Sequence, residues 1–274
     1  MSKDFETVRE FYDQGAEYEW ARLERHPFEF TLTTWMMDQY IRPGESVLDI
    51  GGGPGRYSLY FAKKGCQVTL AELSEGNVAL ARRKAEEAGV SFAAYAKNCL
   101  ELDELNLGQF DHVFLMGPLY HLLDEADRVR AVEIALRHLK PGGILYVSFI
   151  LLFAGILYDL QNAGYIVSDC ANPATAPLID AVAEGKDWGG PAFTTAYFYH
   201  QRNILPFMER FGLEKLHFFG QESILAPNYQ DILARDQAEI DQWIEVAKKY
   251  IEVPELLSYS EHAMYIGRKP EGTA

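Results

Sequence analysis

The chain has 274 residues, enough for one large domain or two small ones, and 48% of them are hydrophobic while 24% are charged. This composition excludes collagen-like and disordered classes of protein. The 40 acidic and 25 basic residues give a formal net charge of −15. We therefore expect neither nucleic acid nor an anionic membrane as a main partner, because both call for a positive protein surface.

The cysteines and the N-terminus predict the cellular compartment of the protein. Cys66, Cys99 and Cys170 have the spacing of neither a metal knuckle nor a CxxC pair, which predicts free thiols in a reducing compartment. The first ten residues are charged and contain no apolar leader, so we predict a cytoplasmic protein. The uncharged stretch between Lys140 and Asp159 opens with a Pro-Gly-Gly turn, which favours a buried strand and a helix start over a membrane span.

Short apolar strands alternate with helices through the first part of the chain. Residues 1–40 are predicted to be helical and aromatic, with Pro27 at the first position of a helix that runs to about Tyr40. Strands are predicted at 46–50, 67–71, 90–96, 110–116 and 143–150, and helices at 57–64, 75–88 and 125–139. This alternation predicts a parallel, doubly wound α/β sheet with right-handed crossovers.

Residues 151–199 interrupt this rhythm. The segment contains three prolines, a Gly-Gly pair and five acids against one base, and we expect a partly helical insertion over the sheet edge where ligands bind. The alternation then resumes with helices at 202–210 and 232–250 and strands at 213–220 and 263–268. We predict a single domain, 1–274, made of a helical cap (1–40), a core (41–150), the insertion (151–199) and the C-terminal part of the sheet (200–274).

A glycine cluster follows the first predicted strand. Residues 47–56 read Val-Leu-Asp-Ile-Gly-Gly-Gly-Pro-Gly-Arg and lie between a strand and a helix, as a nucleotide-binding loop requires. A dinucleotide loop has the spacing GxGxxG, whereas Gly51, Gly53 and Gly55 give GxGxG and Arg56 takes the place of the last glycine. The loop therefore fits a small ligand better than a pyrophosphate, which disfavours a nicotinamide oxidoreductase.

The run Asp49-x-Gly51-x-Gly53-x-Gly55 resembles motif I of the class I S-adenosylmethionine-dependent methyltransferases. Residues 110–121 resemble motif IV of that family, and residues 139–143 resemble its Leu-Lys-Pro-Gly-Gly turn before strand five. The Gly-Pro-Leu-Tyr-His-Leu sequence after strand four resembles one subgroup of the family. The resemblance implies a seven-stranded Rossmann-like sheet whose last strand is antiparallel and lies between strands five and six.

The resemblance also implies a set of residues that bind the methyl donor. Glu72, about twenty residues beyond the loop, would accept hydrogen bonds from the ribose hydroxyls, and Asn98 or Cys99 would contact the adenine, with the choice open. Arg22 would pair with the donor carboxylate, or instead belong to a surface ion pair. The remaining donor contacts that we predict are Asp49, Gly51, Gly52, Gly53, Gly55, Leu73, Met116, Gly117, Tyr12 and Tyr18.

Methyl transfer from a sulfonium needs alignment and exclusion of water rather than a universal catalytic residue. His121 and Tyr120 are the predicted catalytic residues: His121 as a base or an acceptor anchor, and Tyr120 as an aromatic face for the donor. A histidine that merely fixes the turn is the alternative for His121, and His262 is predicted to be structural. No Asp, Glu and His cluster has metal-ligand spacing, so no metal is expected.

The function predicted from the sequence is transfer of a methyl group from S-adenosylmethionine to a small-molecule acceptor, with S-adenosylhomocysteine as the other product. Two alternatives stay open: a methyltransferase that acts on a protein or RNA, and a protein that binds the donor without catalysis. A homodimer is the default expectation for the assembly.

Overall fold

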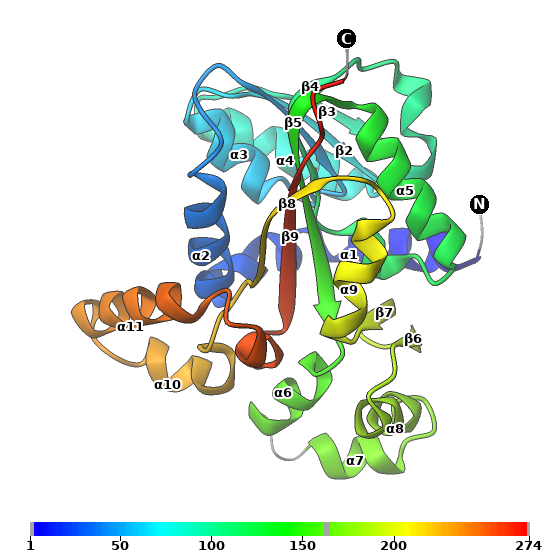
Figure 1. Ribbon diagram of the computed structural model, residues 1–274, viewed down its shortest axis with the longest axis vertical. Coiled ribbons are helices and arrows are strands. Elements are labelled where there is room, and N and C mark those ends of the chain that lie inside the picture. The colour runs from blue at the N-terminus through cyan, green and yellow to red at the C-terminus, as the bar shows by residue number, and fades with distance from the viewer. Residues whose placement is uncertain (1–2, 162–164, 273–274) are drawn as a thin grey trace.

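The computed structural model describes residues 3–161 and 165–272, and over these ranges the chain folds around one mixed sheet with helices on both faces (Figure 1). The nine strands in the described residues are β1 (Ser46–Ile50), β2 (Gln67–Glu72), β3 (Ala93–Ala96), β4 (Phe110–Leu115), β5 (Leu139–Leu151), β6 (Trp188–Pro191), β7 (Thr195–Tyr199), β8 (Glu214–Gly220) and β9 (His262–Arg268). The α/β class that the sequence predicts is confirmed.

Helices precede and follow the strands. The α-helices are α1 (Lys3–Arg25), α2 (Pro27–Met37), α3 (Arg56–Lys63), α4 (Glu75–Glu87), α5 (Glu125–Arg137), α6 (Ala154–Gln161), α7 (Tyr165–Ala171), α8 (Ala176–Glu184), α9 (Gln201–Glu209), α10 (Tyr229–Leu233) and α11 (Gln237–Tyr250). Short 3-10 helices include η1 (Cys99–Leu105) and η2 (Pro118–His121). Pro27 opens α2 at its first position, as predicted.

Seven of the nine described strands have the topology predicted for a seven-stranded sheet, and β6 and β7 are additional to it. Strands β3, β2, β1, β4 and β5 are neighbours in that order and run parallel. Strand β9 lies between β5 and β8 and is antiparallel to both of them. The predicted last strand is therefore confirmed in its place and in its direction.

The sheet is buried on both faces, which explains its nearly continuous apolar strands. Successive residues alternate between two hydrophobic clusters: in β4, Val113 and Leu115 pack with α5 and α9, while Phe114 packs with α2 and α3. In Figure 1, α5 and α9 lie to the right of the sheet and α2 and α11 to the left. Because parallel strands share a carboxyl edge, the loops that follow β1, β2 and β4 meet at that edge.

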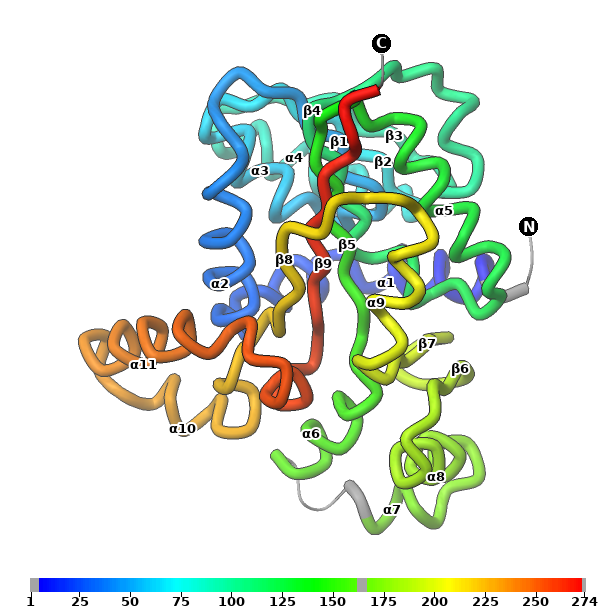
Figure 2. The backbone as a smooth tube through the Cα atoms, viewed as in Figure 1, coloured from blue at the N-terminus to red at the C-terminus, as the bar shows by residue number. Residues whose placement is uncertain are grey.

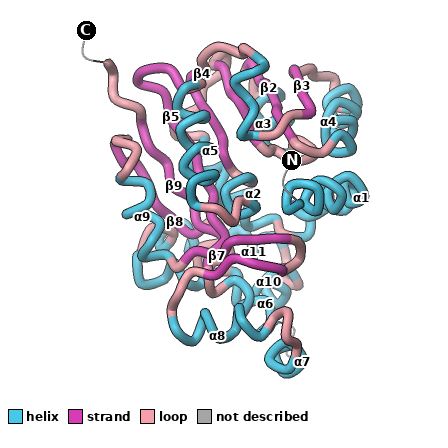
Figure 3. The backbone as a smooth tube through the Cα atoms, turned by 90° about the vertical axis from the view of Figure 1, so that its right-hand side faces the viewer, coloured by secondary structure: helices cyan, strands magenta, loops and turns pink. Residues whose placement is uncertain are grey.

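The insertion leaves from the carboxyl end of β5 and returns through β7 (Figure 2). Strand β5 pairs with β4 as far as Val147, and farther along the chain it pairs with β7 at Ile150 and Leu151. Strand β7 therefore lies on the same side of β5 as β4 and pairs with β5 beyond the point where β4 ends. Figure 3 shows this hairpin lying across the lower ends of the strands, at the predicted sheet edge. Residues 162–164 of the predicted insertion lie outside the described residues.

The hairpin β6–β7 is an element that the sequence analysis did not predict. The Gly189–Gly190 pair was interpreted there as part of an irregular segment, but both glycines lie within β6. A Cβ atom on Gly189 would lie 2.9 Å from the Tyr197 ring, and one on Gly190 would lie 2.8 Å from Trp188. The pair therefore marks close packing of aromatic rings on the strand and not a break in it.

Several element ends also differ from the predictions. Helix α2 ends at Met37 and not at Tyr40, and the predicted helix 232–250 divides into α10 and α11, where the Asp236 side chain accepts a hydrogen bond from the N–H of Glu239. The Pro-Gly-Gly turn lies inside the irregular beginning of β5, where pairing with β4 shifts register after Phe110.

Helix α1 lies at the carboxyl edge of the sheet and packs against α4, below it in the view of Figure 3. Its Asp13 carboxylate accepts hydrogen bonds from Ser74 Oγ at 2.6 Å and from the N–H of Gly76 at 3.1 Å, at the N-terminus of α4. A carboxylate is favourable there because the helix presents unpaired N–H groups. In the described residues, no helix is long and apolar enough to cross a membrane.

Candidate functional site

A cavity lies at the carboxyl edge of the sheet beneath α1, with about 1080 Å³ of empty space including its opening to solvent. One part of its wall, the β2 end, is formed by Glu72, Leu73, Asn77, Asn98 and Cys99. Another part, the β9 end, is formed by Glu29, Ser148, Gln221 and His262. Strands β2 and β5 are three strand spacings apart, so the cavity extends over about 14 Å of the sheet.

The glycine loop forms the floor of the cavity. Gly51 and Gly53 have φ angles of +69° and +55°, a region that favours glycine. A Cβ atom on Gly51 would lie 2.5 Å from the Pro118 ring, and one on Gly52 would overlap the Asp49 carboxylate. Gly55 differs from the other predicted loop residues, because it does not line the cavity, and a Cβ atom on it would lie 3.1 Å from that of Ala81.

Asp49 and Glu72 are two buried carboxylates on either side of the loop. Asp49 Oδ2 accepts a hydrogen bond from Ser58 Oγ at 2.6 Å, and burial raises the pKa of Asp49 to about 6. Glu72 Oε2 accepts from the N–H of Gly53 at 3.0 Å and Oε1 accepts from the N–H of Ser74 at 2.9 Å, while burial raises the pKa of Glu72. Both carboxylates are therefore fixed in place by neighbouring donors.

Asn77 is a residue of the β2 end that the sequence analysis missed. Its side chain lies beside Glu72, and both of its buried polar atoms lack a hydrogen-bond partner among the described residues. Buried amides are normally paired, so these atoms leave hydrogen-bonding capacity at this end of the cavity. Its place in the first turn of α4, after the capping Ser74, gives only a weak signal in the sequence.

Asn98 and Cys99 both line the cavity, and they differ in what they offer. Asn98 Oδ1 accepts from the N–H of Leu100 at 2.9 Å and caps η1, so its amide N–H₂ group is the part without a partner among the described residues. Burial raises the pKa of the Cys99 thiol to about 12, which keeps the thiol neutral. Asn98 is therefore the stronger hydrogen-bonding group of the two.

His121 connects three segments above the cavity. Its Nδ1 lies 3.0 Å from the carbonyl oxygen of Thr195 in β7, and its Nε2 lies 2.9 Å from the hydroxyl of Tyr12 in α1. Because a carbonyl only accepts, Nδ1 carries the proton and Nε2 accepts from Tyr12. Burial lowers the pKa of His121 to about 4, so the ring is neutral at pH 7 with both nitrogens engaged.

Tyr120, the other predicted catalytic residue, lines the cavity with its ring, while its hydroxyl is bonded within the protein. The hydroxyl donates to the carbonyl oxygen of Met116 at 3.1 Å, and burial raises the pKa of Tyr120. The ring centroid lies 4.9 Å from that of His121 and 6.4 Å from that of His262. An apolar aromatic face therefore lies between the two histidines.

Arg22 lines the cavity but is already paired. Its Nη1 and Nη2 donate to the two oxygens of Glu29 at 2.6 and 3.3 Å, and its Nε donates to Glu19 at 2.8 Å.

Tyr18 does not line the cavity, which corrects the prediction for this residue. Its side chain is 68% exposed and lies 4.0 Å from the Arg25 guanidinium, on the solvent side of α1.

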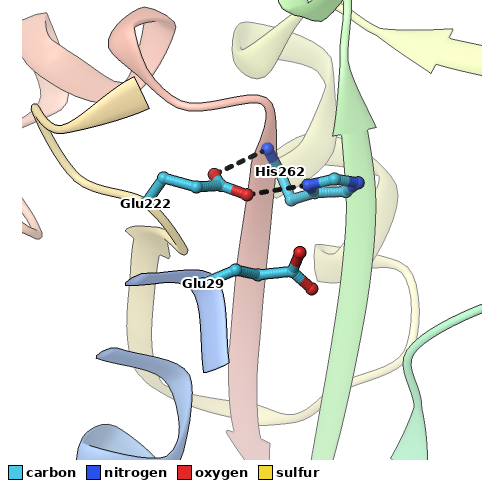
Figure 4. Close-up of side chains that lie close together, drawn as sticks. All are labelled: Glu29, Glu222 and His262. Atoms are coloured by element: carbon cyan, nitrogen blue, oxygen red, sulfur yellow. Dashed lines mark hydrogen bonds and ion pairs between the residues drawn. The ribbon is translucent and has the colours of Figure 1, made fainter. Parts of the chain in front are cut away.

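The β9 end contains polar residues that the sequence analysis did not assign to the site. Ser148 Oγ donates to Gln221 Oε1 at 2.7 Å, and Gln221 Nε2 donates to Thr33 Oγ1 at 3.0 Å, so these groups are satisfied within the protein. His262, predicted to be structural, forms an ion pair with Glu222 at 2.8 Å and lines the cavity (Figure 4).

One ligand atom from each of Glu29, Glu222 and His262 lies within 4.8 Å of the others, a grouping with the dimensions of a metal site. The three residues come from distant segments, so no local spacing revealed the cluster. The Arg22 guanidinium already occupies both oxygens of Glu29. The carboxylates are thus paired with cations of the protein itself, and the cluster does not need a metal for charge balance.

Solved structures define the class of fold to which this chain is similar. A magnesium protoporphyrin IX methyltransferase from Synechocystis PCC 6803, solved with bound SAH, has a TM-score of 0.59 and 15% identity over 97% of this chain and 100% of its own. A 1,6-didemethyltoxoflavin-N1-methyltransferase from Burkholderia thailandensis has a TM-score of 0.57 and 15% identity over 96% and 88% of the two chains. The fold is therefore the Rossmann-like fold of methyltransferases.

The relatives found by sequence are more similar to this chain than the solved structures are, but they match a smaller part of it. Residues 47–143 match the family model described as a methyltransferase domain. A ubiquinone biosynthesis O-methyltransferase of Pseudomonas paraeruginosa is 34% identical over 125 residues, 46% of this chain and 53% of its own length. Its counterpart in Hahella chejuensis is 35% identical over 152 residues, 54% and 62% of the two chains. The matches span little more than half of these relatives.

Proposed function

We propose that this protein transfers a methyl group from S-adenosylmethionine to a small-molecule acceptor. One observation carries the proposal: a single cavity joins the glycine loop and the Glu72 carboxylate at one end to a polar cluster at the other. The match of residues 47–143 to a methyltransferase domain covers that loop and the ends of β2 and β4. The cavity thus extends from the loop proposed to bind the donor to a polar end that is available to an acceptor.

The residues at the β2 end suit the adenosine part of the donor. The fixed Glu72 carboxylate has acceptor capacity for two ribose hydroxyls, and the unpaired Asn77 amide lies next to it. The amide N–H₂ group of Asn98 suits a nitrogen acceptor on the adenine edge, which favours Asn98 over Cys99 for that contact. The positive φ angles of the loop let its backbone approach the ligand closely.

Residues between the two ends suit the reacting part of the donor. The aromatic face of Tyr120 attracts a sulfonium as it attracts other cations. Glu19 and Arg22 lie side by side on α1. The Glu19 carboxylate suits the ammonium group of the donor, and the Arg22 guanidinium suits its carboxylate. Arg22 would then bind the donor while it also bonds to Glu19 and Glu29. Residues of helix α1 cover the cavity and shield it from water, as direct displacement requires.

The cavity and the charge of the chain support a small acceptor. The β9 end is enclosed by α1, α2 and the sheet, and the formal net charge of −15 disfavours a polyanionic acceptor. The relatives named ubiquinone biosynthesis O-methyltransferase also support a small molecule. We keep the homodimer as the expected assembly.

Thermal unfolding with separate ligands tests the donor. We expect S-adenosylmethionine and S-adenosylhomocysteine to raise the melting temperature by about 5–10 °C at 100 times their dissociation constants, and NADH and FAD to leave it unchanged. In Glu72→Gln the dissociation constant for S-adenosylhomocysteine should rise about tenfold or more, because a charge-assisted contact to the ribose is lost.

The matched control is Glu75→Ala, which removes an exposed acid from the first turn of the neighbouring helix and should leave binding unchanged. A response to NADH alone, or equal binding by Glu72→Gln and the wild type, would contradict the proposed donor site.

A further inference from the structure

The β9 end of the cavity contains a histidine held in one orientation by a buried carboxylate. Glu222 Oε2 accepts hydrogen bonds from the backbone N–H groups of Glu261 and His262, each at 3.1 Å. Its Oε1 lies 2.8 Å from His262 Nδ1 (Figure 4). Because a carboxylate only accepts, Nδ1 carries a proton, and the other ring nitrogen, Nε2, points away from Glu222.

The Nε2 atom is the free hydrogen-bonding position of this end. This atom has no hydrogen-bond partner among the described residues, and it is accessible rather than enclosed by protein. It therefore faces the cavity that His262 lines. The other polar groups here are engaged: Ser148 and Gln221 with each other, and Glu29 with Arg22. A ligand at the β9 end therefore meets one unused imidazole nitrogen.

Charges around the ring favour a proton on that nitrogen. Burial by itself lowers the pKa of His262, but the charge of Glu222, its hydrogen bond and the charge of Glu29 outweigh burial and raise the pKa to about 9. The charged and titratable groups that face the ring are Glu222 and Glu261 beside it, Glu29 and His26 at the start of α2, Arg22 on α1 and Tyr120 on η2.

We propose, on the basis of the function proposed above, that His262 is a catalytic residue that binds an acidic hydroxyl of the acceptor as its oxygen anion, with Glu222 as the positioning residue. The class of acceptor is then a molecule with an ionisable O–H group, such as a phenol, an enol or a carboxylic acid. An amine acceptor does not need this arrangement, because it reacts in its neutral form.

The step balances in atoms and charge. The acceptor hydroxyl releases its proton to solvent as it binds, and its oxygen anion accepts a hydrogen bond from the protonated Nε2. The oxygen then uses an electron pair to form the new bond to the methyl carbon, and the carbon–sulfur bond breaks with its pair left on sulfur. The sulfonium becomes a neutral thioether, and the positive charge is kept on the imidazolium beside Glu222. The Glu222 carboxylate therefore stabilises the charge that the histidine carries during transfer.

His121 is less suited to this role, although the sequence singled it out. Both of its ring nitrogens are engaged, by Tyr12 and by the Thr195 carbonyl, and burial lowers its pKa to about 4. A group that is neutral and fully bonded neither holds an anion nor takes a proton at neutral pH. Its contacts instead fasten α1 and β7 to η2.

The experiment uses 4-nitrophenol, whose anion is yellow, as a probe for the full chain saturated with S-adenosylhomocysteine. At one pH unit below the pKa of the free probe, we expect binding to wild-type protein to increase the anion absorbance. In His262→Asn the amide can still donate to Glu222, but Nε2 is gone, so the anion should bind about 10- to 100-fold more weakly.

The control is His217→Asn, because His217 forms a similar ion pair with Glu252 at 2.9 Å and does not line the cavity. It should behave as the wild type. Should His262→Asn not fold, Glu222→Gln serves as the second variant, and less of its bound probe should be ionised.

Three results would overturn the inference: no anion bound by wild-type protein, equal anion binding by wild type and His262→Asn, or tight binding of Zn²⁺ alone that disappears in Glu29→Gln, which would make the cluster a metal site. Calorimetry with S-adenosylhomocysteine on the same samples separates the two proposals. Donor-product binding without probe ionisation means that only this inference fails, and no donor-product binding means that the proposed function fails.

Discussion

Two half-buried histidines of the same cavity have opposite charge states at neutral pH. His121 is surrounded by a carbonyl and a phenol and loses its proton on burial, whereas His262 faces the carboxylates of Glu222 and Glu29 and keeps its proton. The difference in charge arises from the neighbouring groups and not from the degree of exposure, because both residues are half-buried. From the sequence alone His121 was the more attractive base, since it directly follows strand β4.

The charge state of His262 leads to a prediction about stability. Its pKa is about 9 in the folded protein and about 6.5 in an unfolded chain. Its stabilising contribution is therefore complete below about pH 6.5 and is lost as the pH rises toward 9. The difference in unfolding free energy between wild type and His262→Asn should shrink by about 2–3 kcal/mol over that interval, with denaturant unfolding at a series of pH values as the measurement. A difference that does not change with pH would contradict the assignment.

At the scale of elements, helix α1 forms the roof of the cavity through a few polar contacts. Asp13 holds it on the N-terminus of α4, and Tyr12 holds it on His121. A Cβ atom on Gly76 would lie 2.9 Å from the carbonyl oxygen of Asp13, so the two helices are in close contact. Ion pairs of Glu17 with Arg83 and of Glu24 with Arg56 add to these contacts, but all of them involve side chains, so we expect α1 to open before the hydrogen-bonded sheet does.

Asp13→Ala should therefore loosen α1 without unfolding the sheet. We expect faster amide hydrogen exchange in residues 3–25 and about three- to tenfold weaker binding of S-adenosylhomocysteine, because two hydrogen bonds to a carboxylate are lost. Glu10→Ala, which removes an exposed acid from the same helix, is the control and should change neither property. Unchanged exchange in Asp13→Ala would mean that other contacts hold the helix.

The sequence predicted the elements whose signals are local. The apolar runs of β1, β4 and β5, the glycine loop and Pro27 of α2 each indicate structure within a few residues, and each is found in the structure. The β6–β7 hairpin was missed because its glycines resemble a turn signal, whereas in the structure they make room for the Trp188 and Tyr197 rings of the same hairpin. The β9 end was missed because Glu29, Glu222 and His262 meet only after α2, β8 and β9 have packed.

For the whole molecule, the sheet topology turns separate loops into one site. The order β3-β2-β1-β4-β5 places the loops after β1, β2 and β4 side by side, and β9 beside β5 adds His262 to the same edge. The glycine loop and the residues of the β2 end belong to the part of the chain that matches a methyltransferase domain, whereas Glu29, Glu222 and His262 lie outside residues 47–143. Under the proposed function, we therefore expect the acceptor to be selected by segments that the family match does not cover.

The net charge of the molecule gives the last prediction. A formal charge of −15 repels a polyanion at distances up to about the Debye length, roughly 10 Å in 0.1 M salt. We expect no increase in the fluorescence anisotropy of a labelled single-stranded or duplex RNA at micromolar protein in 0.1 M salt. Lowering the salt should not induce binding, because no counterions are released when a negative surface meets RNA. Binding that weakens steeply as salt is added would instead reveal a basic surface strong enough to outweigh the overall charge, and would favour a nucleic-acid acceptor over a small molecule.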